Sequence, residues 1–176
     1  MRQNKNIHYF FDMDGVIARW AKASIEETYK KGFFRSRTPE QVVIDAIKKM
    51  LRLGYRVSIL SAAYVDDHSV SDKIAWLKAN GLGDIDMIFV PYGEDKHKYL
   101  KDTTASLYVL IDDFSPVLFS WEGVGNRFLG IKFMNGINGT HGTWNGYTIS
   151  AKMSKDKIVT AITSIAEAEA EEAANG

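Results

Sequence analysis

The chain has 176 residues, 45% of them hydrophobic, and its 22 basic and 22 acidic side chains give a formal net charge of zero. This length suffices for the core of one domain, whereas the balanced charge disfavours binding to polymeric nucleic acid, which usually requires a basic face. The sequence has no cysteine, which excludes disulfides, thiolate zinc sites and a cysteine nucleophile.

The first third of the chain alternates between apolar runs and segments of helical periodicity. Ile7–Phe11 is typical of a buried strand, and residues 18–31 are helix-like. The sequence from Thr38 to Gln41 resembles a helix start, with Thr38 as the N-cap and a proline in the first turn. Apolar residues at helical spacing follow over residues 42–51 and stop before Gly54. These patterns predict a strand, a helical insertion and a second helix.

The same alternation continues to the C-terminal end. We predict strands at residues 56–60, 87–90, 107–111 and 129–133. Helices are expected at residues 67–80 and from Ser115 onward, and a helical pattern occupies residues 154–176 but decays into Ala/Glu repeats. Residues 135–146 are rich in Gly and Asn and are predicted to form a loop. Strands that alternate with helices favour an α/β fold with a parallel sheet.

The apolar runs are all shorter than the roughly 20 residues that a membrane-spanning helix needs. The first residues are polar, and the run after them is too short for the apolar region of a signal peptide. We therefore expect a cytoplasmic protein without a membrane partner, organised as a single domain over residues 1–176.

Polar side chains that can do chemistry follow three of the predicted strands. Asp12 and Asp14 follow the first strand, Ser61 the second, and Asp112 and Asp113 the fourth. The carboxyl ends of parallel strands share one edge of a sheet, where α/β proteins bind ligands. Crowded carboxylates repel one another, and a divalent cation offsets that repulsion. Lys96 lies before the fourth strand and is expected to add a positive charge, with the nearby Lys98 as the alternative.

These residues resemble the four motifs of the haloacid dehalogenase-like (HAD) phosphatase superfamily, which are matched by Asp12-Met13-Asp14-Gly15-Val16, Ile59-Leu60-Ser61-Ala62, Lys96 and Leu110-Ile111-Asp112-Asp113. The resemblance implies a Rossmann-like three-layer α/β sandwich with a central, mostly parallel sheet. It also implies a small helical cap insertion, here at about residues 18–37.

Within that superfamily the chain is most similar to the 5'(3')-deoxyribonucleotidase branch, through the segments Gly32-Phe33-Phe34-Arg35, Val90-Pro91-Tyr92-Gly93, Asp112-Asp113-Phe114-Ser115 and Gly130-Ile131-Lys132-Phe133. The resemblance implies that Asp12 is the nucleophile, forming an aspartyl-phosphate, and that Asp14 is the general acid and base. It also implies that Ser61, the Ala62 amide and Lys96 bind the phosphoryl group.

The resemblance further implies Mg²⁺ as the cofactor. Its ligands would be the Asp12 carboxylate, the Asp14 backbone carbonyl and an acid of the Asp112–Asp113 pair. The sequence leaves open which member of that pair ligates directly.

The insertion is the expected determinant of substrate choice. Trp20, Phe33 and Phe34 are candidates to stack on a nucleobase, because a flat ring favours aromatic neighbours. Arg35 and Arg37 are candidates to bind a phosphate or a carbonyl group. The alternative is that Phe33 and Phe34 only anchor the insertion to the core.

The sequence therefore predicts a magnesium-dependent hydrolase of small phosphomonoesters, and in particular a 5'-nucleotidase acting on (pyrimidine) deoxyribonucleoside monophosphates. The alternative within the enzyme class is a phosphatase for a sugar or cofactor phosphate. A phosphatase for nucleic-acid ends is less favoured because no basic groove is apparent. A non-catalytic binding module on the same fold is the alternative from another class. The sequence does not predict the oligomeric state.

Overall fold

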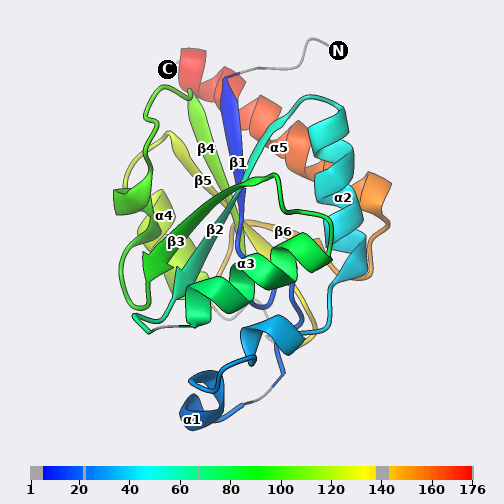
Figure 1. Ribbon diagram of the computed structural model, residues 1–176. Helices are drawn as coiled ribbons and strands as arrows, with labels where there is room; N and C mark the ends of the chain where they lie inside the picture. The colour runs from blue at the N-terminus through cyan, green and yellow to red at the C-terminus, as the bar shows by residue number, and fades with distance from the viewer. Residues whose placement is uncertain (1–5, 22, 67, 138–142, 176) are drawn as a thin grey trace.

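The computed structural model describes residues 6–21, 23–66, 68–137 and 143–175, and it contains a six-stranded sheet (Figure 1). The strands are β1 (Ile7–Phe11), β2 (Arg56–Ala63), β3 (Asp86–Pro91), β4 (Leu107–Asp112), β5 (Phe128–Met134) and β6 (Tyr147–Ser150). All neighbouring strands pair in parallel, in the order β3-β2-β1-β4-β5-β6. The order reverses direction at β1, so a crevice opens between the carboxyl ends of β1 and β4.

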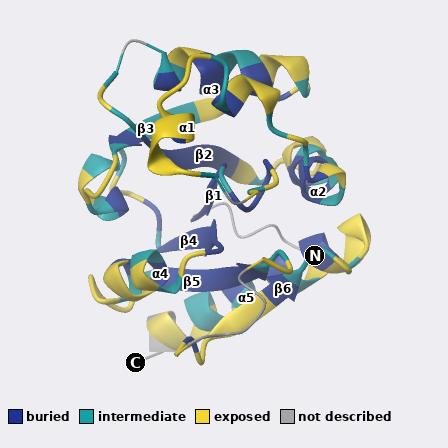
Figure 2. Cartoon of the chain, turned by 90° about the horizontal axis from the view of Figure 1, so that it is seen from below, coloured by how far each residue is buried: buried dark blue, intermediate teal, exposed yellow. Residues whose placement is uncertain are grey.

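Helices cover both faces of the sheet (Figure 2). They are α1 (Ile25–Thr28), α2 (Gln41–Arg52), α3 (Ser69–Ala79), α4 (Ser115–Glu122) and α5 (Lys155–Asn175), with short 3₁₀ turns η1 (Phe34–Ser36) and η2 (Lys96–Tyr99). Tyr9 and Phe11 of β1 pack with α2, α3 and α5, whereas Phe10 packs with α4 on the other face. This alternation follows from the two-residue period of a strand, and it confirms the predicted three-layer α/β fold.

The helix expected over residues 18–31 is much shorter than predicted. Among the described residues of this segment, α1 alone is α-helical, and a capping box between Ser24 and Glu27 starts it. The start of the segment is held otherwise: the Met13 carbonyl accepts from the amides of Ile17 and Ala18, at 3.0 and 2.8 Å, and closes a tight loop, and the Arg19 amide donates to the Thr38 carbonyl.

The predicted N-cap at Thr38 is also wrong, because α2 begins at Gln41 with Glu40 before it. Thr38 does not cap the helix; its carbonyl accepts a hydrogen bond from the Arg19 amide at 2.8 Å. Glu40 accepts from Arg19 as well, with 2.9 Å between the Arg19 Nε and a Glu40 carboxylate oxygen. The two ends of the insertion at residues 18–37 are therefore held side by side.

The insertion lies beyond the carboxyl ends of the strands and is fastened to α3 (Figure 1). The Asp72 carboxylate accepts from the Gly32 amide at 2.5 Å, and the Trp76 indole donates to the Arg37 carbonyl at 2.6 Å. These bonds join side chains of α3 to the backbone of the insertion, so its path is determined by tertiary contacts more than by local helical propensity.

Two features near the C-terminal end differ from the expectation. Strand β6 was not predicted, because only Ile149 of its four residues is buried and the pattern is correspondingly weak. Helix α5 continues to Asn175 rather than decaying. Residues 138–142 of the predicted loop lie outside the described residues. Among the described residues, no helix is both long and apolar enough to cross a bilayer.

Helix α5 belongs to the core, and we expect the core contact of Ile158 to stabilise the whole protein. Ile158 is 0% exposed and packs in the cluster that includes β1 and α2. The change Ile158→Ala should lower the free energy of unfolding by about 2–5 kcal/mol, because it leaves a cavity. Urea denaturation measures this loss. The control Leu51→Ala, at a side chain that is 39% exposed, should cost under about 1 kcal/mol.

Candidate active site

The loop that follows β1 presents two carboxylates to the sheet edge. Asp12 still pairs with β4, through a 2.9 Å bond from its amide to the Ile111 carbonyl. Met13 is fully buried, so the alternation of side chains brings Asp12 and Asp14 to the same pocket. Gly15 then turns the chain with a φ of +82°, and a Cβ there would lie 2.2 Å from the Asp113 carboxylate. Glycine is required at this position for both reasons.

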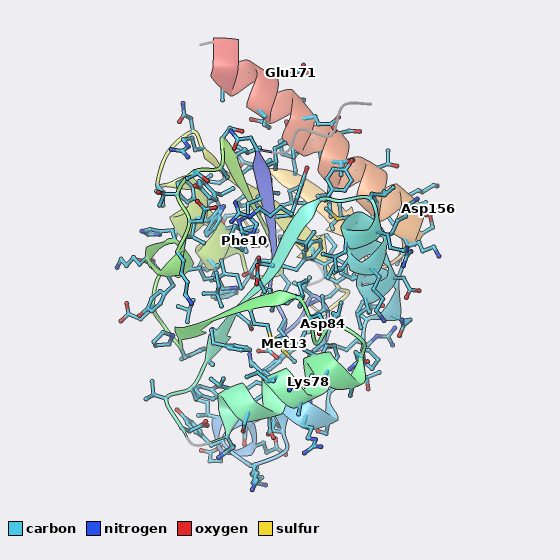
Figure 3. The ribbon with its side chains drawn as sticks, turned by 45° about the horizontal axis from the view of Figure 1, so that its top comes forward. Phe10, Met13, Lys78, Asp84, Asp156 and Glu171 are labelled. Carbon is cyan, nitrogen blue, oxygen red and sulfur yellow. The ribbon has the colours of Figure 1, made fainter. Side chains whose placement is uncertain are left out.

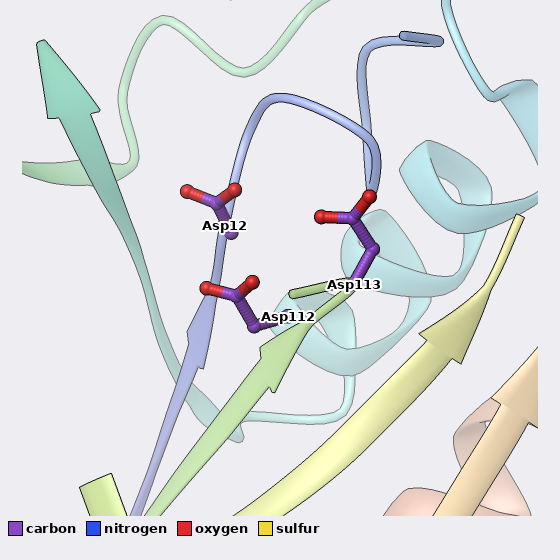
Figure 4. Close-up of side chains that lie close together, drawn as sticks. All are labelled: Asp12, Asp112 and Asp113. Carbon is purple, nitrogen blue, oxygen red and sulfur yellow. The ribbon is translucent and has the colours of Figure 1, made fainter. Parts of the chain in front are cut away.

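Asp12, Asp112 and Asp113 form a buried acidic cluster at the crevice between β1 and β4 (Figure 4). One carboxylate oxygen from each residue lies within 4.8 Å of those of the others. Asp12 comes from the end of β1, and the other two from the end of β4. As expected from the sequence, the acids of the first and fourth motifs therefore lie together at one edge of the sheet.

Lys96 is the cation of this cluster. Its Nζ donates to Asp12 at 2.8 Å and to Asp112 at 2.7 Å, and its side chain is 5% exposed. Lys98, the alternative, pairs with Asp95 instead, and its side chain is 56% exposed. The structure therefore brings Lys96, and not Lys98, to the carboxylates.

Asp14 does not join the acidic cluster, because its carboxylate pairs with Lys73 of α3. Sequence reasoning missed Lys73, which is 0% exposed. A signal was present: Lys73 precedes Trp76 and Leu77 by three and four residues, a spacing that puts it on the buried face of α3. A lysine on such a face needs a buried partner.

Asn135 is a second residue that the sequence did not single out. Its amide donates to the Gly15 carbonyl at 2.9 Å and to the Asp113 carboxylate at 2.8 Å. These two bonds join the loop after β1 to the end of β4 across the crevice. Nothing in the sequence around Asn135, which begins a Gly/Asn-rich loop, distinguishes it from a turn residue.

Burial and repulsion raise the pKa values of the crowded acids. Burial, reinforced by Asp112 and Asp12, raises the pKa of Asp113 to about 8. Burial also raises the pKa of Asp112, although Lys96 opposes the rise. For Lys96 itself, burial favours the neutral form, but Asp112 and Asp12 outweigh it and raise its pKa above the usual range.

The cluster has the chemistry of a site for a divalent cation. Three carboxylates face one ammonium group, so their charge is only partly compensated when all are ionised. Hard cations such as Mg²⁺ prefer carboxylate oxygens. Asp12, Asp112 and Asp113 are therefore a fitting ligand set, and the Asp14 carboxylate, held by Lys73, is not part of it.

A pocket of about 570 Å³ opens above the acids. Asp12, Asp14 and Lys96 line it, together with aromatic side chains from several segments of the chain, namely Trp20, Phe34, Tyr64, Tyr92, Phe114 and Trp121. Tyr64 and Tyr92 were not singled out from the sequence. Their rings lie 5.2 Å apart, and they belong to the chain that follows β2 and β3. A small ligand with an apolar ring and an anionic group suits such a lining.

The residues proposed for substrate contact divide into two groups. Trp20, Phe34 and Ala62 line the pocket. Phe33, Arg35 and Ser61 are not among the lining residues. Phe33 packs under the Arg37 guanidinium at 4.0 Å, a contact within the insertion, and Arg35 is exposed on η1. The Ser61 hydroxyl is buried and accepts from Lys73 at 3.0 Å.

No protein-family model matches this sequence, and no curated protein does. Among solved structures, the chain is similar to one chain in the "Structure of Pnkp1/Rnl/Hen1 complex", with a TM-score of 0.57 and 16% sequence identity. The similarity covers 73% of this chain and 46% of that chain, so this chain spans less than half of its length. At this identity the likeness shows the α/β fold alone.

The raised pKa of Asp113 predicts that stability falls as pH rises when no divalent cation is present. The carboxyl keeps its proton up to about pH 8 in the folded state, but loses it near pH 4 when unfolded. Folding therefore takes up a proton between these values, and each added pH unit costs up to about 1.4 kcal/mol. Urea denaturation in a chelator at pH 5, 6 and 7 measures this slope.

The matched variant for this experiment is Asp113→Asn, which has no proton to exchange at that position. Its slope should be shallower than that of the wild type, and adding Mg²⁺ should flatten the wild-type slope because the cation competes with the proton. If the unfolding free energies of the two proteins changed equally with pH in chelator, the raised pKa of Asp113 would be contradicted.

Proposed function

We propose that the protein is a divalent-cation-dependent phosphohydrolase that acts on a small phosphomonoester. The observation that carries this proposal is that two acids of one loop, Asp12 and Asp14, have different partners. Asp12 lies in the acidic cluster with Lys96, while Asp14, two residues on, lines the same pocket outside that cluster. A nucleophile and an acid–base group need such different surroundings.

In the first step, an Asp12 oxygen attacks phosphorus and the bond from phosphorus to the ester oxygen breaks. Protonated Asp14 gives its proton to the departing oxygen, which leaves as an alcohol. The products are an aspartyl-phosphate on Asp12 and an ionised Asp14. Burial raises the pKa of Asp14, although Lys73 opposes the rise, and a raised pKa favours the protonated form that this step uses.

In the second step, Asp14 takes a proton from water as the water oxygen attacks phosphorus. The bond between phosphorus and the Asp12 oxygen breaks, inorganic phosphate leaves, and both carboxyl groups return to their starting states. Lys96 donates to Asp12 and Asp112 and so places a positive charge beside the phosphoryl group in both steps. A divalent cation held by Asp12, Asp112 and Asp113 would add charge neutralisation at the phosphoryl oxygens.

We propose a deoxyribonucleoside 5'-monophosphate as the substrate. Support comes from the aromatic lining of the pocket, where Trp20 and Phe34 of the insertion and Tyr64 and Tyr92 offer faces for a flat base. The acids and Lys96 line the same pocket, so one ligand with a ring and a phosphate would contact both kinds of surface. Phe33 and Arg35 are not part of this proposal.

Replacement of the nucleophile tests the mechanism. Asp12→Asn should lower metal-dependent phosphate release by on the order of 10³-fold or more, because an amide oxygen attacks phosphorus poorly. Phosphate release with Mg²⁺ measures the loss, and circular dichroism checks the fold. The control Asp84→Asn, at an exposed acid near the end of α3 (Figure 3), should keep wild-type activity. Turnover by Asp12→Asn at the wild-type rate would exclude the mechanism and favour a non-catalytic role for the site.

A substrate panel tests the proposed specificity. We expect deoxyribonucleoside 5'-monophosphates to be cleaved with kcat/KM at least about tenfold above that of sugar phosphates, since a lost apolar contact costs that much. Phosphate release from both classes, from ribonucleotides and from a 3'-phosphorylated oligonucleotide is measured with Mg²⁺ and with a chelator. Activity confined to sugar phosphates, or to the oligonucleotide, would refute the proposed substrate while leaving the hydrolase proposal in place.

A further inference from the structure

Lys73 is the buried lysine that sequence reasoning missed, and its ammonium group is enclosed by the two loops that carry the first and second motifs. Its Nζ donates to the Asp14 carboxylate, to the Ala62 carbonyl at 2.6 Å and to the Ser61 hydroxyl at 3.0 Å. An ammonium group has three donors, so these three oxygens use all of them. The side chain has no exposed surface.

The insertion closes the remaining side of this amine. The Nζ of Lys73 lies 4.6 Å from the centroid of the Phe34 ring. Phe34 belongs to η1 of the insertion, is 3% exposed and also lines the pocket. A cation over a ring face is attracted to it, the more strongly when water is excluded. Lys73 therefore contacts the loop after β1, the end of β2 and the insertion at once.

This arrangement fixes one of the two oxygens of Asp14. Lys73 binds Oδ2, whereas Oδ1 is buried and has no hydrogen-bond partner among the described residues. The Asp14 side chain is 21% exposed and lines the pocket, so the carboxyl group that Lys73 holds remains open to a ligand. A carboxyl group held by one oxygen also loses rotational freedom, which is the condition for an efficient proton transfer.

We propose that Lys73 is a positioning residue for Asp14, holding Oδ2 so that the carboxyl group is aligned with the leaving oxygen of the substrate. This inference rests on the proposed function. Direct binding of the phosphoryl group by Lys73 is not favoured, because its three donors are already used and it is fully buried. Lys96, which lines the pocket, is the lysine placed for that role.

Substrates with different leaving groups can show whether Lys73 positions the acid Asp14 or has another role. An alkoxide needs a proton as it departs, whereas p-nitrophenolate departs without one. The parameter kcat/KM reports the steps up to phosphoryl transfer to Asp12, in which the leaving oxygen departs. Loss of a well-placed general acid should therefore reduce kcat/KM for an alkyl phosphate and spare kcat/KM for p-nitrophenyl phosphate.

The experiment compares wild type with Lys73→Met on both substrates in the presence of Mg²⁺. The alkyl phosphate is a deoxyribonucleoside 5'-monophosphate, or whichever alkyl ester the wild type cleaves best. We expect kcat/KM for this ester to fall about 10²-fold, the contribution of a general acid, and kcat/KM for p-nitrophenyl phosphate to fall less than about threefold. The control Lys78→Met removes an exposed lysine of the same helix (Figure 3) and should change neither value.

Two results would overturn the inference. Equal losses on both substrates would mean that Lys73 supports the phosphate site or the fold rather than the acid. A wild-type protein that cleaves neither ester would refute the proposed function and this role with it. If Lys73→Met does not fold, Lys73→Gln replaces it, because its amide can still donate to Asp14. That variant should show the same selectivity for the alkyl ester with a smaller loss, and equal losses would again overturn the inference.

Discussion

The repulsion among three buried carboxylates is the constraint on which the site depends. Asp12, Asp112 and Asp113 are brought together because β1 and β4 are neighbours at the point where the strand order reverses. The fold keeps them there with Lys96 between two of them and Asn135 bonded to the third. Buried like charges are costly unless they are paired, so this edge of the sheet holds its carboxylates together at a cost in stability.

The positive charges at the site are divided between two lysines with separate partners. Lys96 of η2 forms ion pairs with Asp12 and Asp112 of the acidic cluster, while Lys73 of α3 forms one with Asp14. Asp12 and Asp14, which are two residues apart in the sequence, therefore have different electrostatic surroundings. Such a difference is what allows neighbouring carboxyl groups to take different roles in one reaction.

The parts of the fold that could be predicted are those where local pattern and tertiary structure agree. Strand β1 is a continuous apolar run that is buried throughout, and parallel pairing then forces Asp12 toward Asp112. Strand β6 could not be predicted, because Ile149 is its one buried residue and a single apolar residue gives no strand periodicity. The helix expected over residues 18–31 does not start at Ala18, because the amides of Ala18 and Arg19 donate to the carbonyls of Met13 and Thr38. Lys73 was passed over because lysine is rarely buried, although its spacing from Trp76 placed it inward.

The pairing of Ala18 with Pro39 has a consequence for how such a protein can diversify. The insertion leaves and re-enters the sheet scaffold at adjacent points, through that bridge and the Arg19–Glu40 pair. Its length and sequence can then vary without altering the separation of β1 from α2, in the way that surface loops with neighbouring ends accept insertions. A change within the insertion would therefore leave the acidic cluster and Lys96, which come from other segments, in place. A replacement without an aromatic ring in the place of Phe34 would leave the buried amine of Lys73 uncovered on that side.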